Sequence, residues 1–234
     1  MASTIAPNGG SAQTVGRAIA LLKLVASSHS RHLRLADLAQ LAGLEKSTAH
    51  RLLQRLVQED MLVRDGKSGY RIGPLTHELG LADRPESDLR GASHTALCQF
   101  AEATGEMTFL VKRSGFQTVC LDRIDGAFPI QTLTRGVGDR HPLGAGAGGL
   151  AILAAMDDRE LDVVTPALTT PLAGYGLTRE SLQGRVDLTR RRGLALDEGQ
   201  AAPGVTAIGR AVHDRQGSPV GAVFIATIRN RMTA

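Results

Sequence analysis

The stretch KSTAHRLLQRL, residues 46–56, decides the fold of the first third of the chain. Apolar residues recur in it at helical spacing, which predicts an amphipathic helix from Lys46 to about Asp60, capped by Ser47 or Thr48. The apolar stripe of this helix consists of Leu52, Leu53, Leu56 and Val57. Such a stripe buries one face of the helix and leaves the polar face open to a partner.

The segments around this helix complete a known motif. A shorter helical pattern, residues 35–41, precedes it and stops before Gly43, so the two helices are joined by a short turn that contains glycine. This arrangement is typical of a helix-turn-helix. A longer periodic segment, residues 14–27, comes before the pair, and two alternating stretches, residues 61–64 and 69–72, follow it as a predicted hairpin. The order predicts a winged helix.

The polar face of the predicted recognition helix carries side chains that can bind DNA. Serine, threonine, histidine, glutamine and arginine reach base edges or phosphates, and the start of a recognition helix usually touches bases. We therefore assign Ser47, Thr48 and His50 to bases, and Arg51 and Arg55 to bases or phosphates. The full set of candidates is Lys46, Ser47, Thr48, His50, Arg51, Gln54 and Arg55 on the helix, with Arg64, Lys67 and Arg71 on the wing. The alternatives are a solvated helix face and an ordinary polar hairpin tip.

The charge of the chain is unevenly distributed. The formal net charge is +4, from 27 Lys and Arg against 23 Asp and Glu. Residues 1–80 contain 10 basic and 6 acidic residues, whereas the remaining 17 basic and 17 acidic residues cancel. This asymmetry favours an anionic partner for the first third of the chain.

Composition argues against several other classes of protein. No stretch approaches the roughly 18 uninterrupted apolar residues of a transmembrane helix. Residues 1–10 lack the basic start and apolar run of a secretory signal, and we expect residues 1–13 to be a short disordered tail of a cytoplasmic protein. The two cysteines, Cys98 and Cys120, are too few for a disulfide scaffold and form no CxxC pair. We expect them to be reduced and inertly packed, and we expect no metal, no cofactor and no membrane partner.

The sequence predicts two domains of different architecture. The winged helix-turn-helix occupies residues 14–73, a linker helix and polar boundary occupy residues 74–86, and the second domain occupies residues 87–234. Strands alternate with a few helices in the second domain, which indicates an α+β fold. The expected helices are 89–104, 150–156 and 180–192, and the expected strands are 107–113, 117–124, 129–134, 194–197, 204–213 and 220–228.

Two motifs in the second domain are candidates for chemistry. The run GAGAGG, residues 144–149, precedes a predicted helix, where small residues let backbone N–H groups approach an anion. It lacks the context of a dinucleotide or phosphate-binding loop, and the alternative is a flexible linker or a close-packed turn. Asp197 and Glu198 form a carboxylate pair that can act as acid and base. No nucleophile or metal-ligand cluster accompanies them, so we expect an exposed or pocket-edge pair and no catalytic residue.

Several separate motifs, in order along the chain, resemble the IclR-type transcriptional regulators. They are TVGRA at 14–18, KSTAHRLLQRL at 46–56, YRIG at 70–73, PLGAGAGGLA at 142–151 and GLALDEG at 193–199. The resemblance runs from about Thr14 to Ile228. It implies an N-terminal winged helix-turn-helix and a C-terminal effector-binding domain with a GAF-like fold. It also implies homodimers or homotetramers on double-stranded operator DNA near catabolic genes, and a small organic acid or aromatic metabolite as effector.

The resemblance further implies which residues line the effector pocket. Carried onto this sequence, and with Gly146 added as part of the small-residue turn, they are Ile130, Leu133, Gly146, Ala147, Gly148, Asp197, Glu198, Ala207, Phe224 and Ala226. Some family members carry cysteine or serine where Ala207, Phe224 and Ala226 stand here. These apolar side chains favour an amphipathic effector, with a carboxylate or carbonyl at the glycine-rich turn and Asp197 and Glu198 at the rim.

Two other classes of function stay open at this point. An enzyme would act on a small acid through Asp197, Glu198 and the glycine-rich run. A ligand-independent architectural module would bind DNA and use its second domain only to dimerise. The hypothesis that the motifs favour is a ligand-responsive, DNA-binding transcriptional regulator that is not an enzyme.

Overall fold

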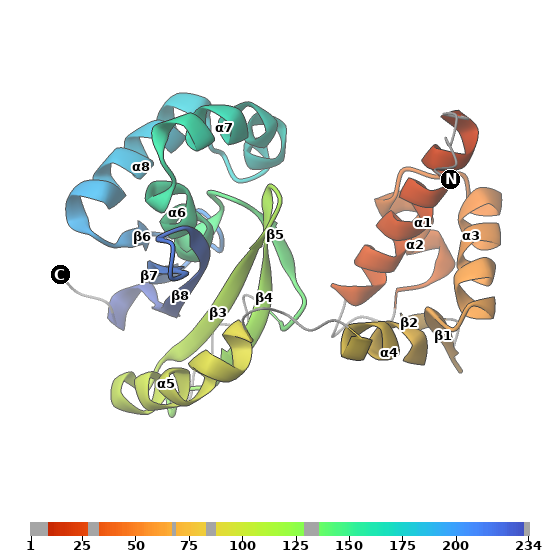
Figure 1. The fold of residues 1–234 in the computed structure, drawn as a ribbon, viewed down its shortest axis with the longest axis horizontal. Coiled ribbons are helices and arrows are strands. Elements are labelled where there is room, and N and C mark those ends of the chain that lie inside the picture. Colours follow the sequence, from red (N-terminus) through yellow and green to blue (C-terminus); the bar gives the residue numbers. More distant parts are fainter. Residues whose placement is uncertain (1–8, 28–32, 67–68, 83–87, 129–135, 232–234) are drawn as a thin grey trace. The chain divides into compact units, whose positions relative to one another are not determined.

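The computed structural model describes residues 9–27, 33–66, 69–82, 88–128 and 136–231. The expected strand 129–134 and the candidate site residues Lys67, Ile130 and Leu133 lie outside the described residues. The chain divides into two compact units, Met1–Glu86 and Ser87–Ala234. Each unit is described by itself below (Figure 1).

The first unit is a winged helix-turn-helix, as the sequence predicts. Its elements are α1 (Gly9–Ala26), α2 (Leu35–Leu41), α3 (Lys46–Gln58), β1 (Leu62–Asp65), β2 (Gly69–Ile72) and α4 (Pro74–Ala82). The first helix begins at Gly9, within the segment expected to be a disordered tail, and not near Thr14. Residues 11–13 are polar or small and contain no helix breaker. They extend the helix without adding to the apolar periodicity that marks it in the sequence.

The turn between α2 and α3 is set by Gly43. Its φ of 62° lies in the left-handed region, which glycine adopts at little cost. The amide of Gly43 donates to the carbonyl of Gln40 at 3.1 Å, and the amide of Leu44 donates to that of Ala39 at 2.9 Å. This pair of hydrogen bonds is a Schellman motif, which ends α2 and turns the chain into α3.

The expected side-chain cap of α3 is wrong. The N-cap is Glu45, which makes no capping hydrogen bond through its side chain, and its carbonyl accepts from the amide of Ala49 at 2.9 Å. Because the tight turn already ends at Glu45, helical bonding starts there. Ser47 and Thr48 therefore lie inside the first turn of the helix.

A small apolar core holds the first unit together. The predicted stripe of α3 is confirmed, with Leu53 fully buried and Leu52, Leu56 and Val57 packed beside the core. The buried residues of this core are Leu21, Val25, Leu38, Leu53, Leu62 and Tyr70.

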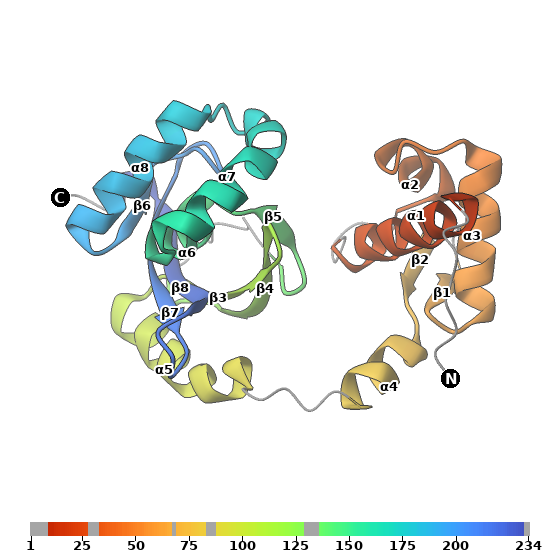
Figure 2. The same ribbon diagram turned by 45° about the horizontal axis from the view of Figure 1, so that its top comes forward.

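The second unit is built on a six-stranded antiparallel sheet with the order β5-β4-β3-β8-β7-β6. Its strands are β3 (Met107–Ser114), β4 (Gln117–Ile124), β5 (Arg140–Pro142), β6 (Ala195–Asp197), β7 (Val205–His213) and β8 (Pro219–Ile228). Its helices are α5 (Leu89–Thr104), α6 (Gly146–Ala155), α7 (Asp158–Ala173) and α8 (Arg179–Arg192), and a 3-10 turn, η1 (Arg229–Arg231), follows β8. Helix α5 covers one face of the sheet, while α6, α7 and α8 lie on the other side (Figure 2). The expected α+β class is confirmed.

The glycine-rich run was expected to precede a helix, but its residues 146–149 form the first turn of that helix. Helix α6 begins at Gly146, whereas the sequence places its start near Leu150. A Cβ on Gly148 would lie 2.9 Å from both Phe224 Cδ1 and Val111 Cγ2. The small residues are therefore needed for close packing of α6 on the sheet, which is the close-packed alternative considered for this run.

Helix α7 has no counterpart among the expected elements. It contains Pro166 and Pro171, and each proline removes one backbone donor and argues against a helix in a sequence. The helix nevertheless forms, because it buries Leu161, Val164, Leu168 and Leu172 in the core of the second unit.

Candidate DNA-binding and effector-binding sites

The polar face of α3 presents most of the predicted DNA-binding side chains to solvent. Thr48 and His50 are half-buried. The exposed residues of the set are Lys46, Ser47, Arg51, Gln54 and Arg55. A solvent-facing row of this kind is what major-groove binding requires.

One of these arginines already has a partner. Arg55 forms an ion pair with Glu59, one turn further along α3, and both side chains are exposed. Exposed i,i+4 pairs are worth only about 0.3–0.5 kcal/mol. A DNA phosphate can therefore take the place of Glu59 at little cost.

The two described wing arginines lie on opposite faces of the hairpin. Arg64 is paired with Tyr70 across the strands, and Arg71 is paired with Val63. The guanidinium of Arg64 lies 5.9 Å from the centre of the Tyr70 ring, within range of a cation–π contact. The sequence analysis placed both arginines at one wing tip. Because successive residues of a strand point to opposite faces, their side chains lie on different sides of the hairpin.

A hollow of about 450 Å³ lies between the recognition helix and the wing. His50 lines it from α3, and Arg64 and Tyr70 line it from the wing. His50 thus faces this hollow from its half-buried position, which distinguishes it from the exposed row of Arg51 and Gln54.

In the second unit a small cavity lies between the start of α6 and the end of the sheet that carries β6, β7 and β8. Its volume is about 30 Å³. Predicted effector residues that it brings together are Gly146, Ala147, Asp197, Ala207, Phe224 and Ala226. Residues that line it without having been predicted are His141, Ala201, Ala202 and Val205.

Two predicted effector residues lie elsewhere. Gly148 does not line the cavity, since it packs against the ring of Phe224. Glu198 is exposed and borders a neighbouring hollow with Arg185 and Gln200.

Asp197 does not lie at the rim of the cavity, although the sequence analysis expected it there. It is 2% exposed, and its Oδ1 accepts from the guanidinium of Arg185 on α8 at 2.8 Å. Its Oδ2 accepts from the amide of Ala201 at 3.1 Å. Glu198 is exposed, because β6 ends at Asp197 and successive side chains there point to opposite sides. The two carboxylates do not form an acid–base pair.

His141 on β5 adds a second polar group to the cavity wall. Its Nδ1 lies 3.0 Å from the hydroxyl of Tyr175. No sequence motif marks His141, because its place in the cavity depends on the pairing of β5 with β4, where it lies opposite Thr118.

The apolar side of the cavity is closed by stacked rings. The ring of Phe224 stacks on that of Phe109, with centroids 4.8 Å apart and planes 9° from parallel. A volume of about 30 Å³ holds a water molecule or two and is too small for an aromatic acid. An organic ligand requires the side chains around this cavity to move.

Within the described residues, no helix is long and apolar enough to span a membrane. The same residues contain no group of three or more His, Cys, Asp or Glu side chains arranged to hold a metal ion.

A winged helix with an exposed basic recognition helix, followed by a helix-covered antiparallel sheet with an internal cavity, defines a two-unit DNA-binding transcriptional regulator. Comparison with known families agrees. Residues 85–234 match the family described as bacterial transcriptional regulator IclR, C-terminal, and residues 14–66 match the IclR helix-turn-helix domain. The chain belongs to the IclR family, whose members are transcriptional regulators and not enzymes.

Individual relatives extend this result. The glycerol operon regulatory protein of Streptomyces griseus is 32% identical over 91% of this chain and 84% of its own length. A solved IclR transcriptional regulator from Alicyclobacillus acidocaldarius shares the fold, with a TM-score of 0.73, 24% identity, and coverage of 95% of this chain and 90% of its own. An IclR homolog from Microbacterium hydrocarbonoxydans, solved in complex with 4-hydroxybenzoate, has a TM-score of 0.69, 21% identity, and coverage of 94% and 91%.

Proposed function

We propose that this regulator controls a catabolic operon in the cytoplasm and responds to a small hydroxylated organic acid. Operator DNA binds to α3 and the wing, and the acid binds at the cavity between α6 and the sheet. The observation that carries the proposal is this cavity, which gathers Gly146, Asp197, Ala207 and Phe224 from segments far apart in the sequence.

The chemistry of the cavity supports the class of ligand. A carboxylate accepts hydrogen bonds, so Asp197 favours a ligand that places a hydroxyl or another donor beside it. The N-terminus of α6, at Gly146 and Ala147, carries a partial positive charge that favours a carboxylate or carbonyl on the ligand. Ala207 and Phe224 supply an apolar wall for the body between these two ends. The compound 4-hydroxybenzoate, named for a homolog of the same fold, has all three features.

Regulation follows from the size of the cavity. Because it is too small for such an acid, the ligand-bound form must differ from the described one, with the Phe224 ring and its neighbours displaced. A ligand shifts an equilibrium between two forms only by its difference in affinity for them. The small size of the cavity supplies that difference, since the ligand fits only the rearranged form.

The assembly follows from the symmetry of such regulators. We expect a homodimer or homotetramer on a pseudo-palindromic operator, with half-sites about one helical turn apart or a multiple of that. Sedimentation and footprinting on the DNA upstream of the gene test this expectation. A strict monomer that protects a single half-site contradicts it.

Thermal unfolding and operator binding, measured with and without 4-hydroxybenzoate and related hydroxy acids, test the effector. We expect at least one of these acids to raise the melting temperature and to change operator affinity. Ala207→Leu, which fills the cavity, should abolish both responses. Glu198→Gln is the matched control outside the cavity and should respond as the parent does. If no acid changes either quantity, or if Ala207→Leu responds fully, the proposed ligand class or its site is wrong.

A further inference from the structure

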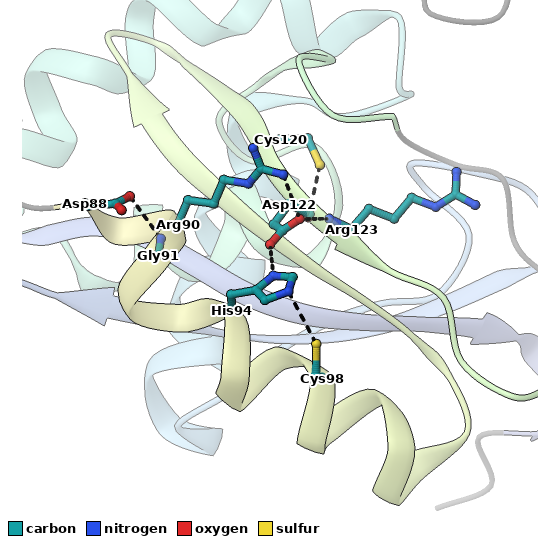
Figure 3. A network of polar contacts seen from close by, with 8 residues as sticks. All are labelled: Asp88, Arg90, Gly91, His94, Cys98, Cys120, Asp122 and Arg123. Carbon is teal, nitrogen blue, oxygen red and sulfur yellow. Dashed lines mark hydrogen bonds and ion pairs between the residues drawn. The ribbon is translucent and has the colours of Figure 1, made fainter. Parts of the chain in front are cut away.

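The face of the sheet opposite α6 carries a second polar cluster, formed by His94 and Cys98 on α5 and Asp122 on β4 (Figure 3). His94 Nδ1 lies 2.7 Å from Asp122 Oδ2, and its Nε2 lies 3.7 Å from the sulfur of Cys98. None of these residues lines the cavity described above. A thiol, an imidazole and a carboxylate in this order resemble the arrangement of an activated nucleophile.

A β-bulge places the carboxylate on this face. In the pairing of β3 with β4, Leu110 faces Asp122, whereas the next residue, Val111, faces Cys120. Leu121 is therefore an extra residue in β4. In a regular strand without such a bulge, Cys120 and Asp122, which are two residues apart, would point to the same side of the sheet. With it, Cys120 joins the core beneath α6, while Asp122 points to α5.

The hydrogen bonds of Asp122 fix the orientation of the imidazole. The side chain of Asp122 is 5% exposed, and its Oδ1 accepts from the amide of Arg123 at 3.1 Å and lies 3.6 Å from Arg90 Nη2. Its Oδ2 accepts from His94, so the proton of the neutral ring is on Nδ1. The lone pair of the ring is then on Nε2, which faces Cys98.

Cys98 belongs to a row of α5 residues that is mostly exposed to solvent. Arg90, His94 and Cys98 follow one another at four-residue spacing along α5, and Glu102 continues the row. The His94 side chain is 53% exposed, and Cys98 is partly exposed. Cys120, the other cysteine of the chain, is 1% exposed in the core beneath α6, so it cannot pair with Cys98 in this fold.

We propose that Cys98 is a modification site that reacts with small disulfides by thiol–disulfide exchange. His94 Nε2 takes the thiol proton as the Cys98 sulfur attacks one sulfur of the disulfide. A new sulfur–sulfur bond forms to Cys98, the old one breaks, and the leaving thiolate receives the proton from His94. One disulfide is consumed and one is formed, so no further oxidant is needed. Asp122 acts as a positioning residue, since it orients His94 and does not touch the thiol.

A purely structural role for the same contacts makes a different prediction. If the pair of His94 and Asp122 only fastens α5 to the sheet, its loss lowers stability and leaves the intrinsic reactivity of Cys98 unchanged. The rate of thiol labelling in the folded protein therefore separates the two roles.

The test measures the reaction of the native full-length protein with Ellman's reagent, a small aromatic disulfide, at pH 7. We expect one fast-reacting thiol per chain, which Cys98→Ser abolishes and Cys120→Ser retains. His94→Gln, at an exposed position, should slow that thiol by about tenfold or more, because an ordinary thiol is only a few per cent ionised at pH 7 without help. Asp122→Asn should slow it as well. At pH 10, where an ordinary thiol is ionised without help, His94→Gln should react at the parental rate.

Two further measurements keep the test decisive. Circular dichroism melting shows whether His94→Gln remains folded at the labelling temperature, and oxidised glutathione should give a mixed disulfide at Cys98 that mass spectrometry locates. If His94→Gln is folded and labels at the parental rate at pH 7, or if Cys98 fails to react in the parent protein, the proposal is wrong.

Discussion

Phe224 on β8 lies between Phe109, on which it stacks at 4.8 Å, and Gly148 of α6, where an added Cβ would come within 2.9 Å of its ring. One aromatic ring therefore joins the sheet, the glycine-rich turn and the wall of the cavity. Both the stability of the second unit and the size of its cavity depend on this contact.

Phe224→Ala should lower the free energy of unfolding by about 3–5 kcal/mol, because it removes a buried ring and leaves a void. Urea unfolding of the full chain measures the loss. Phe116→Ala is the matched control, since that ring is 48% exposed and its loss should cost no more than about 0.5 kcal/mol. Equal losses in the two variants would show that Phe224 is not part of a packed core.

Gly148→Ala should destabilise the protein by about 1–3 kcal/mol, because the added methyl group meets the rings and side chains of a closed core. Gly184→Ala is the corresponding change in α8, where nothing lies within 4 Å of the added Cβ. There the higher helix propensity of alanine should raise stability by about 0.5–1 kcal/mol. Melting temperatures that shift in the same direction for both variants contradict this account of α6.

Arg185→Met should cost about 3–5 kcal/mol, since it leaves the carboxylate of Asp197 buried without its cation. The second substitution Asp197→Asn, added to Arg185→Met, should restore part of the loss by removing that charge. Arg123→Met is the control, because its partner Asp125 is half-exposed and such pairs contribute at most about 1 kcal/mol. Denaturant unfolding that finds Arg185→Met no worse than Arg123→Met would rule out a structural role for the buried pair.

Arg51→Ala should weaken operator binding by about 1–3 kcal/mol if the guanidinium reads a base. If Arg51 contacts a phosphate instead, the slope of log K against log salt should become shallower by about 0.9. Fluorescence anisotropy over a range of salt concentrations measures both quantities. Arg159→Ala, which removes an exposed arginine from the second unit, should change neither. Unaltered affinity and slope in Arg51→Ala would remove this residue from the DNA interface.

The winged helix could be predicted from the sequence because its signals are local. The spacing of Leu52, Leu53 and Leu56, the glycine of the turn and the alternating hairpin each act within a few residues. The helix caps were less predictable. Whether Glu45 or Ser47 caps α3 depends on where the preceding Schellman turn ends, and this is a matter of backbone geometry.

The candidate effector site could be predicted only in part. The glycine-rich run and Asp197 were found through motifs, but their burial could not be predicted. The burial of the run depends on how α6 packs on the sheet, and that of Asp197 depends on Arg185 from another helix. His141 carries no motif at all, since it reaches the cavity through the pairing of a three-residue strand. Helix α7 was missed because its two prolines outweigh its apolar spacing in a purely local reading.

The bulge at Leu121 also limits how this strand can change in evolution. Side chains of β4 alternate between the two faces of the sheet up to Cys120 and again from Asp122 onward. The extra residue shifts this alternation by one position, so Cys120 and Asp122 lie on opposite faces although they are two residues apart. Loss of a residue elsewhere in β4 would put the side chains beyond it on the wrong face, or force the strand to slip against β3. Loss of Leu121 itself would only remove the bulge, because Cys120 and Asp122 would then be neighbours in a regular strand and would stay opposite Val111 and Leu110. Length variation in this part of the chain should therefore be confined to Leu121 and to the Ser114–Gln117 turn.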